Sequence, residues 1–155
     1  MILSAKYELM RKNFRNFAET EFTTEIQEQL DKEGGFNEEI WKKMAKYGFS
    51  GVKIPTKYGG QGGDSLAYVL MNEEFSRVCP VLAIYANTPN SLGGGPLLAC
   101  GNEEQLQKYL VPVAKGEKHI VFALTEPGAG SDAGSMTTRA VEDGDYYVLN
   151  GRKCF

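Results

Sequence analysis

A change of hydrophobic pattern near residue 119 constrains this chain more than any other feature. Before it, apolar side chains recur at three- to five-residue intervals among charged ones, which is typical of amphipathic helices. After it, residues 119–125, 137–141 and 146–151 are rich in β-forming side chains, with a turn centred on Gly144 between the last two stretches. We therefore predict a mainly α-helical domain over residues 1–117, followed by the beginning of a β domain over residues 118–155.

Capping residues and helix breakers set the expected helix boundaries. The predicted helices span residues 5–30, 38–47, 65–78, 82–100 and 102–110. Asn37 and either Asp64 or Ser65 are suitable N-caps, while Gly48 and Pro112 are expected to end helices. A third strand is expected to begin at residues 152–155. Because two or three strands do not form a stable sheet alone, we expect the chain to be a fragment of a longer protein.

Charge and hydropathy exclude two classes of protein. The net charge is -3 and the sequence pI about 5.3, whereas nucleic-acid-binding proteins normally carry an excess of positive charge. The mean hydropathy is -0.34, and no apolar run approaches the roughly 20 residues that span a bilayer. The N-terminal residues mix both charge signs with apolar side chains, unlike a signal peptide. We expect a cytoplasmic protein with no nucleic-acid partner and no membrane insertion.

Cysteine and histidine usage gives no metal site. The three cysteines form no Cys-x-x-Cys pair, and their odd number favours reduced thiols. His119 is the single histidine, so the sequence holds no cluster of nitrogen ligands for zinc. A Ser-His-Asp triad would have to use His119, whose position before an apolar run favours the edge of a strand instead.

Residues 122–135 carry the most chemical information. Gly128 and Gly130 allow backbone N–H groups to approach an anion closely, and the hydroxyls of Thr125 and Ser131 can donate to a phosphate or to the polar edge of a heterocycle. The glycines also satisfy a loose G-x-G-x-x-[GA] pattern, but no helix pattern follows it, as a dinucleotide fingerprint requires. From these residues alone, a ligand-binding loop and a plain turn both stay open.

The sequence of this stretch resembles that of a known family. Residues 124–132, which read LTEPGAGSD, closely resemble the signature of the acyl-CoA dehydrogenases, and residues 47–63 resemble a glycine-rich loop of the same family. Further similar segments follow in the family's order at residues 90–93, 101–105, 109–112 and 147–153. The resemblance covers essentially the whole chain. Several segments are similar to short-chain and enoyl-CoA-reducing members that work with an electron-transferring flavoprotein.

The resemblance implies a fold and an assembly. Members of this family have an N-terminal helical domain, a β-barrel-like middle domain and a C-terminal helical bundle, with FAD between the last two. This chain would then be the helical domain and the beginning of the β-barrel-like domain. A homotetramer is implied for the full-length protein.

The resemblance also implies which residues contact the isoalloxazine ring of FAD. Phe122, Leu124 and Thr125 match positions beside the ring, with Thr125 a hydrogen-bond donor to its pyrimidine side. Phe155 matches an aromatic residue, usually tryptophan, that flanks the ring. Phenylalanine at 122 and 155, in place of the family's usual tyrosine and tryptophan, keeps the ring packing but loses the polar tips.

Two further positions match the rest of the cofactor and the substrate. Gly130 and Ser131 match positions at the pyrophosphate, and Ser131 also matches a position that faces the acyl-CoA thioester chain. The helical region at residues 85–90 matches one that borders the acyl-chain pocket, so bulky residues there are expected to limit chain length.

The implied chemistry is α,β-dehydrogenation of an acyl-CoA thioester, or its reversal. A carboxylate removes the α-proton while the β-hydrogen leaves as hydride to flavin N5. The family's base is a glutamate of the C-terminal bundle, outside residues 1–155, so no residue of this chain is expected to be catalytic. Glu126 is expected to shape its loop instead.

Alternatives stay open at this stage. The chain could be a stand-alone helical interaction module with a vestigial flavin loop, or a fragment of an acyl-CoA oxidase, which shares the signature. A second glycine-rich stretch, residues 59–63, could cradle a phosphate, although a turn explains it adequately. We expect residues 1–155 alone to bind FAD weakly or not at all and to have no turnover.

Overall fold

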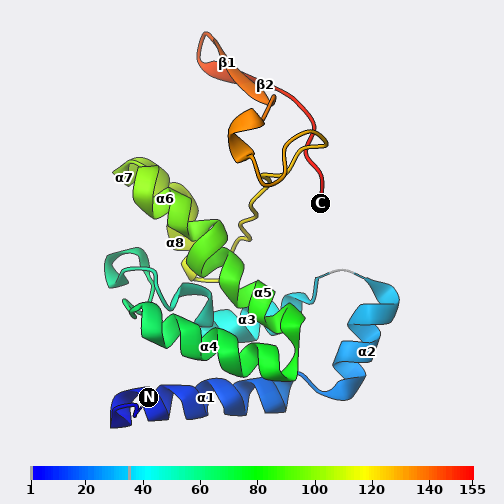
Figure 1. Ribbon diagram of the computed structural model, residues 1–155. Helices are drawn as coiled ribbons and strands as arrows, with labels where there is room; N and C mark the ends of the chain where they lie inside the picture. Colours follow the sequence, from blue (N-terminus) through cyan, green and yellow to red (C-terminus); the bar gives the residue numbers. More distant parts are fainter. Residues whose placement is uncertain (1, 35) are drawn as a thin grey trace. The chain divides into compact units, whose positions relative to one another are not determined.

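The computed structural model describes residues 2–34 and 36–155, which divide into two compact units. The first unit ends at Val121, and the second spans Phe122–Phe155 (Figure 1). The first unit is helical and the second contains a small two-stranded sheet. The predicted domain boundary at residues 117 and 118 stays a prediction.

The first unit is built from short and medium helices. In chain order these are α1 (Ala5–Glu21), α2 (Thr24–Glu33), α3 (Glu38–Lys46), η1 (Phe49–Gly51), η2 (Thr56–Tyr58), α4 (Ser65–Val78), α5 (Pro80–Asn87), η3 (Thr88–Leu92), α6 (Gly94–Cys100), α7 (Glu103–Gln105), η4 (Leu106–Leu110) and α8 (Val111–Ala114). Among the described residues, no helix is both long and apolar enough to cross a membrane.

The caps predicted from the sequence begin two of these helices. The side-chain oxygen of Asn37 accepts from the backbone N–H of Ile40 at 3.0 Å at the start of α3. Asp64 does the same for Ala67 at 2.9 Å at the start of α4. Each cap satisfies one of the donors that a helix N-terminus leaves unpaired. The predicted N-caps Asn37 and Asp64 are confirmed.

The single helix predicted over residues 5–30 is wrong, because the structure breaks it at Phe22 and Thr23. Phe22 leaves helical geometry, with φ -110° and ψ 68°, and is only 2% exposed. Thr23 then caps α2 by accepting from Ile26 N at 3.5 Å. Burial of the Phe22 ring and the new cap together outweigh the continuous apolar spacing that predicted one helix.

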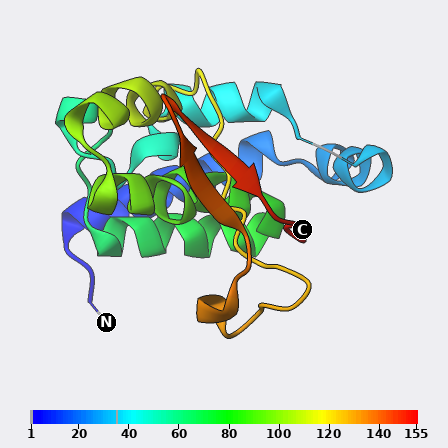
Figure 2. The ribbon, with the colours of Figure 1, turned by 90° about the horizontal axis from the view of Figure 1, so that it is seen from above.

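α1 and α4 lie side by side and run in the same direction (Figures 1 and 2). Their contacts keep sequence order, since Tyr7 donates to Asp64 near one end and Arg77 pairs with Glu19 near the other. Between them, Phe14 and Phe75 pack edge to face with ring centroids 6.1 Å apart. Both rings belong to the main hydrophobic core of the unit.

Glu74 of α4 is a buried carboxylate held by three arginines. It is 1% exposed and accepts from Arg11 Nε at 2.8 Å, from Arg15 Nε and Nη2 at 2.8 and 2.7 Å, and from Arg77 Nε at 3.3 Å. Against the opposing effect of burial, Arg15 above all and then Arg11 lower the pKa of Glu74 from 4.5 to about 2. The cluster ties α1 to α4.

The helix predicted over residues 82–100 is present but changes its winding in the middle. α5 passes into the π-helical turn η3 before α6 begins, and Gly93 N donates to Thr88 O at 2.8 Å. The turn contains Pro89, which has no N–H to donate. It also brings in Asn90, which is 2% exposed.

Asn90 bonds to three backbone groups, two in the irregular segment at residues 49–53 and one in α5. Its amide nitrogen donates to Phe49 O at 2.7 Å and to Ala86 O at 2.8 Å, and its side-chain oxygen accepts from Lys53 N at 2.8 Å. Phe49 O and Lys53 N belong to a segment that has no strand ladder, whereas Ala86 O belongs to the last turn of α5. Asn90 therefore supplies hydrogen bonds that the irregular segment at residues 49–53 would otherwise lack.

The prediction that Pro112 ends the helix at residues 102–110 is wrong. The chain instead winds through α7 and the π-helical turn η4 into α8, and Pro112 lies in the first turn of α8. The missing N–H of a proline costs little at that position, because the first helical N–H groups have no intrahelical partner.

The glycine-rich stretch at residues 59–63 is a turn. Its backbone N–H groups are already used: Gln61 N donates to Gly51 O at 2.8 Å, Gly62 N to Ile54 O at 2.9 Å and Gly63 N to Val52 O at 2.7 Å. A Cβ at Gly60 would lie 2.1 Å from Ile54 O, so only glycine fits there. The loop thus has no free backbone N–H for a phosphate among residues 59–63, and the prediction of a turn is confirmed.

The second unit contains the hairpin of β1 (Arg139–Asp143) and β2 (Tyr146–Asn150), with the 3-10 turn η5 (Ala133–Ser135) before it. The strands are antiparallel, with Arg139 opposite Asn150 and Asp143 opposite Tyr146, and Gly144 adopts a φ of +60° in the turn. The predicted hairpin is confirmed. Every residue of both strands is exposed.

Two other predicted strands are wrong. Residues 119–125 and 152–155 form no strand in the described structure, although both have the composition of one. A strand requires a neighbour for its N–H and C=O groups, and side-chain propensity cannot replace it. The two segments make only isolated contacts with each other, such as Cys154 N with Thr125 O at 2.9 Å.

Candidate functional site

The backbone carbonyls of Leu124 and Thr125, in the second unit, accept hydrogen bonds from residues 153 and 154. Lys153 Nζ donates to Leu124 O at 2.9 Å, and Cys154 N donates to Thr125 O at 2.9 Å. Both carbonyls are therefore occupied. Within residues 2–34 and 36–155, the N–H groups of Leu124 and Thr125 and the Thr125 hydroxyl donate to no partner. The segment thus offers a ligand three free donors, while each of its two carbonyl oxygens already accepts one hydrogen bond.

A tight turn follows this segment. Glu126 N donates to Ala129 O at 3.0 Å, and Ala129 N donates back to Glu126 O at 3.1 Å. A Cβ placed on Gly128 or on Gly130 would meet nothing within 4 Å, so the turn presents bare backbone to open space. This arrangement lets a bulky anion approach the amide groups of the turn.

Glu126 is the buried centre of the unit, at 4% exposed. Its carboxylate accepts from Thr137 N at 2.7 Å, Thr137 Oγ1 at 2.8 Å, Thr138 N at 3.0 Å and Lys153 Nζ at 2.9 Å. The neighbouring Thr138, then the N–H of Thr137 and the ammonium of Lys153, hold the pKa of Glu126 well below its usual range. The prediction that Glu126 shapes the loop is confirmed.

The structure places every predicted site residue in the second unit. Phe122 is 47% exposed and Phe155 is fully exposed, while Leu124 and Thr125 are half-buried. Gly130 and Ser131 are exposed in the loop. The structure brings Leu124 and Thr125 together with residues 153 and 154, and their role toward a ligand stays a prediction.

Sequence reasoning missed Lys153. It donates to Leu124 O, to Glu126 and, at 3.3 Å, to Met136 Sδ, so it joins three parts of the unit. Nothing in its neighbourhood along the chain indicates this, because its carboxylate partner lies 27 residues earlier.

The first unit has a hollow of about 450 Å³, here called the aromatic hollow. It is lined by Phe36, Glu38, Trp41, Ile84, Tyr85, Thr88, Pro89, His119, Ile120 and Val121. Phe36 stacks on Tyr85 with ring centroids 4.3 Å apart, and Tyr85 OH accepts from Asn37 N at 2.9 Å. The walls are thus mainly apolar and aromatic, which suits an apolar or aryl group.

His119 belongs to this hollow and not to the edge of a strand, so that prediction is wrong. Its ring packs against Phe36 and Trp41, with centroids 4.3 and 4.8 Å away, and its Nε2 lies 2.8 Å from Glu38 Oε1. Beside it, Ile120 occupies the space above Gly93, where a Cβ would approach the Ile120 side chain to 2.6 Å. The absence of a side chain at Gly93 thus lets the Ile120 side chain lie close to the backbone.

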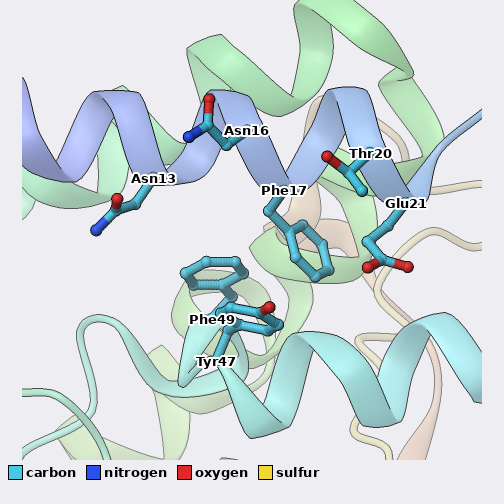
Figure 3. A pocket seen from close by; sticks show the side chains of 7 residues that line it. All are labelled: Asn13, Asn16, Phe17, Thr20, Glu21, Tyr47 and Phe49. Atoms are coloured by element: carbon cyan, nitrogen blue, oxygen red, sulfur yellow. The ribbon is translucent and has the colours of Figure 1, made fainter.

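A second hollow, of about 420 Å³, lies between α1 and the end of α3 (Figure 3). Phe17, Tyr47 and Phe49 form its aromatic side, with Phe17 and Phe49 edge to face at 4.9 Å. Asn13, Asn16, Thr20 and Glu21 line the polar side contributed by α1. In the part of the chain that the structure describes, no three His, Cys, Asp or Glu side chains are grouped to hold a metal ion.

Comparison with protein families identifies this arrangement. Residues 4–117 match the family model "Acyl-CoA dehydrogenase, N-terminal domain", and residues 121–155 match "Acyl-CoA dehydrogenase, middle domain". The chain belongs to the acyl-CoA dehydrogenase family. The resemblance seen in the sequence and the expected fold, a helical domain followed by the beginning of the family's middle domain, are confirmed.

Individual acyl-CoA dehydrogenase family proteins match over the whole chain. "Caffeyl-CoA reductase-Etf complex subunit CarC" of Acetobacterium woodii is 56% identical over 100% of this chain and 41% of its own length. "3-(aryl)acrylate reductase" of Clostridium sporogenes is 54% identical with the same coverage. The structure of butyryl-CoA dehydrogenase from Megasphaera elsdenii is 34% identical and superposes with a TM-score of 0.88, covering 100% of this chain and 41% of that one.

The chain therefore spans about two-fifths of the length of these acyl-CoA dehydrogenase family relatives, 41% of each. Their names describe oxidoreductases, both dehydrogenases and reductases.

Proposed function

We propose that this chain is the N-terminal part of an FAD-dependent acyl-CoA dehydrogenase or enoyl-CoA reductase. The observation that carries the proposal is the polarity of the Leu124–Thr125 segment, whose carbonyls are occupied and whose N–H and hydroxyl donors are free among the described residues. The pyrimidine side of a flavin presents the acceptors N1, O2, O4 and N5 beside a single donor, N3–H, so free N–H and hydroxyl donors can complement it.

The residues of the loop suit the remainder of the cofactor. Gly128 and Gly130 have open space where a side chain would be, so the backbone near Ser131 is accessible to a pyrophosphate. Phe122 and Phe155 are exposed aromatic rings that can pack on an isoalloxazine face. We propose that Phe122, Leu124, Thr125, Gly130, Ser131 and Phe155 contact FAD, and that Ser131 also contacts the acyl-CoA substrate.

The bound flavin would supply the hydride acceptor or donor for chemistry at the β-carbon. Thr125 orients it by hydrogen bonding, and the amide groups of the loop hold its phosphates. The α-proton needs a separate carboxylate base. Glu126 does not suit that role, because its oxygens are occupied by four donors and its pKa is lowered. We propose that the base lies in the sequence beyond residue 155.

Substrate and partner follow from the relatives and from the aromatic hollow. Relatives named for caffeyl-CoA and 3-(aryl)acrylate are more than half identical to this chain, at 56% and 54%. The aromatic hollow has the lining and size to take an aryl group. We propose an aryl-acrylyl-CoA thioester as substrate and an electron-transferring flavoprotein as electron partner of a homotetrameric, cytoplasmic enzyme.

The test is a preparation of the full-length protein that carries this chain. We expect it to purify with about one FAD per subunit and to reduce an aryl-acrylyl-CoA, or oxidise its saturated product, with an electron-transferring flavoprotein as redox partner. Hydrogen peroxide formation at a comparable rate would favour the acyl-CoA oxidase alternative. A full-length protein that binds no flavin would refute the proposal and favour the helical interaction module.

A further inference from the structure

We infer that the ion pair of Glu126 and Lys153 positions the donors of Thr125 for the cofactor. The inference rests on the proposed function, since it assumes that the Leu124–Thr125 segment faces a flavin. It adds that two residues with no predicted contact to FAD determine how well FAD is held.

Lys153 holds the backbone on both sides of Thr125. Its ammonium bridges Leu124 O and Glu126 Oε1, each at 2.9 Å, and these two acceptors stand on either side of Thr125 along the chain. The next residue, Cys154, donates its N–H to Thr125 O at 2.9 Å. Three consecutive residues are therefore held by two others, and the peptide planes around Thr125 cannot rotate without breaking one of these bonds.

Glu126 is anchored to the start of the hairpin. Its remaining acceptor sites are filled by the N–H and hydroxyl of Thr137 and by the N–H of Thr138, which directly precede β1. Lys153 follows β2 closely in the chain. The hairpin therefore joins the two groups of donors that converge on Glu126, and the carboxylate closes the loop of residues 126–138 onto the base of the hairpin.

The ion pair of Glu126 and Lys153 is largely shielded from water. Glu126 is 4% exposed and the Lys153 side chain 26% exposed, so water replaces these contacts poorly. Hydrogen bonds to charged groups are stronger than those between neutral groups, and removal of one partner leaves the other buried and unsatisfied. Loss of either charge should therefore shift the Leu124–Thr125 segment, and weaken the hydrogen bond that Thr125 donates.

The experiment uses the full-length protein that carries this chain, with FAD as the probe. The test variants are Glu126→Gln and Lys153→Met, and Lys153→Arg is the conservative rescue. Asp145→Asn and Arg152→Met are matched controls, because they remove one charge of each sign from exposed positions at the hairpin turn and beside Lys153. FAD dissociation constant, visible absorption spectrum of the bound flavin and thermal stability are measured for each.

We expect Glu126→Gln and Lys153→Met to weaken FAD binding about tenfold or more and to shift the flavin absorption band, because the donors to the flavin move. Lys153→Arg should recover most of the affinity, and both controls should match the wild type. Wild-type affinity and spectrum in Glu126→Gln and Lys153→Met would overturn the inference, even if their stability fell. Absence of FAD from the wild type would instead refute the proposed function.

Coupling to Thr125 separates positioning from general destabilisation. In the wild-type background, Thr125→Val should lower FAD affinity about tenfold, because it removes a donor. In the Lys153→Met background the same change should cost less than about threefold, since the donor is already misplaced. Equal losses in both backgrounds would overturn the inference. This cycle needs no Glu126 variant, so it can be completed if Glu126→Gln does not fold.

Discussion

Glu74→Gln should destabilise the helical unit by an amount that depends on pH. The Glu74 carboxylate is 1% exposed and contacts Arg11, Arg15 and Arg77. Its pKa is lowered from 4.5 to about 2, and one pKa unit corresponds to about 1.4 kcal/mol, so the ionised form contributes about 3 kcal/mol to the free energy of unfolding. Breaking a buried ion pair typically costs about 3–5 kcal/mol, which agrees with this figure.

The pH window follows from the direction of the shift. The folded-state pKa lies below the unfolded value, so the contribution is complete above the unfolded pKa of 4.5 and is lost as pH falls toward about 2. The other carboxyl groups titrate in both proteins and cancel in the comparison. The stability difference between wild type and Glu74→Gln should therefore be about 3 kcal/mol at pH 7 and should shrink steadily below about pH 4.5.

Urea denaturation of residues 1–155, followed by tryptophan fluorescence, measures this difference. Trp41 is the single tryptophan, is 2% exposed and donates its indole N–H to Gly116 O at 3.0 Å, so its emission reports unfolding of the helical unit. With a urea m-value of about 1–3 kcal/mol/M, the midpoint should fall by about 1–3 M at pH 7.

Glu73→Gln is the matched control for this experiment. It removes the same charge from the adjacent, exposed position of α4 and should change stability by less than about 0.5 kcal/mol. A Glu74→Gln protein as stable as wild type at pH 7, or a stability difference that is the same at pH 7 and pH 3, would refute the reasoning.

Three further predictions concern other positions. Gly60→Ala should destabilise the chain by about 2 kcal/mol or more, because its Cβ would lie 2.1 Å from Ile54 O, whereas Gly95→Ala, where a Cβ meets nothing within 4 Å, should be neutral or stabilising in the same urea titration. Asn90→Leu should cost about 3 kcal/mol, because it removes three hydrogen bonds to backbone groups, two of them buried; equal midpoints for Asn90→Leu and wild type would contradict this. In the full-length enzyme, Thr88→Trp should fill the aromatic hollow and raise KM for an aryl-acrylyl-CoA about tenfold. KM for crotonyl-CoA, which has no aryl group, should stay within about threefold of the wild-type value. An equal rise in KM for both substrates would show that the hollow does not select aryl groups.

Local signals predicted the elements that depend on local contacts. Asn37 and Asp64 begin α3 and α4 because each side chain accepts a hydrogen bond from an N–H three residues on. Gly144 marks the hairpin turn because it adopts a positive φ there. In each case the deciding interaction lies within a few residues, where a single sequence is informative.

The wrong predictions depend on contacts between distant residues. Residues 119–125 have the composition of a strand, but no partner strand pairs with them among the described residues. His119 packs on Phe36 and Trp41, which come more than seventy residues earlier along the chain. The break in the first helix requires that Phe22 be buried by the core, which spacing along one helix does not reveal.

The candidate site divides in the same way. The glycines and hydroxyls of residues 122–135 were recognisable because they lie in one short stretch of sequence. The family resemblance then indicated FAD as their ligand. The role of Lys153 could not be predicted from the sequence, because its partners Leu124 O and Glu126 are both more than twenty residues away. The sequence also does not reveal which N–H groups of the loop are free, because this depends on how the backbone folds.

The hairpin also determines how the isolated chain behaves in solution. β1 and β2 have only each other as neighbours among the described residues, so each strand has one outer edge with unpaired backbone groups. Large side chains are exposed on it as well, with Tyr146 at 76% and Leu149 at 72%. Such edges template pairing with further copies, so concentrated samples of residues 1–155 should self-associate through this hairpin. Its amide hydrogens should also exchange with solvent far sooner than those of the helical core.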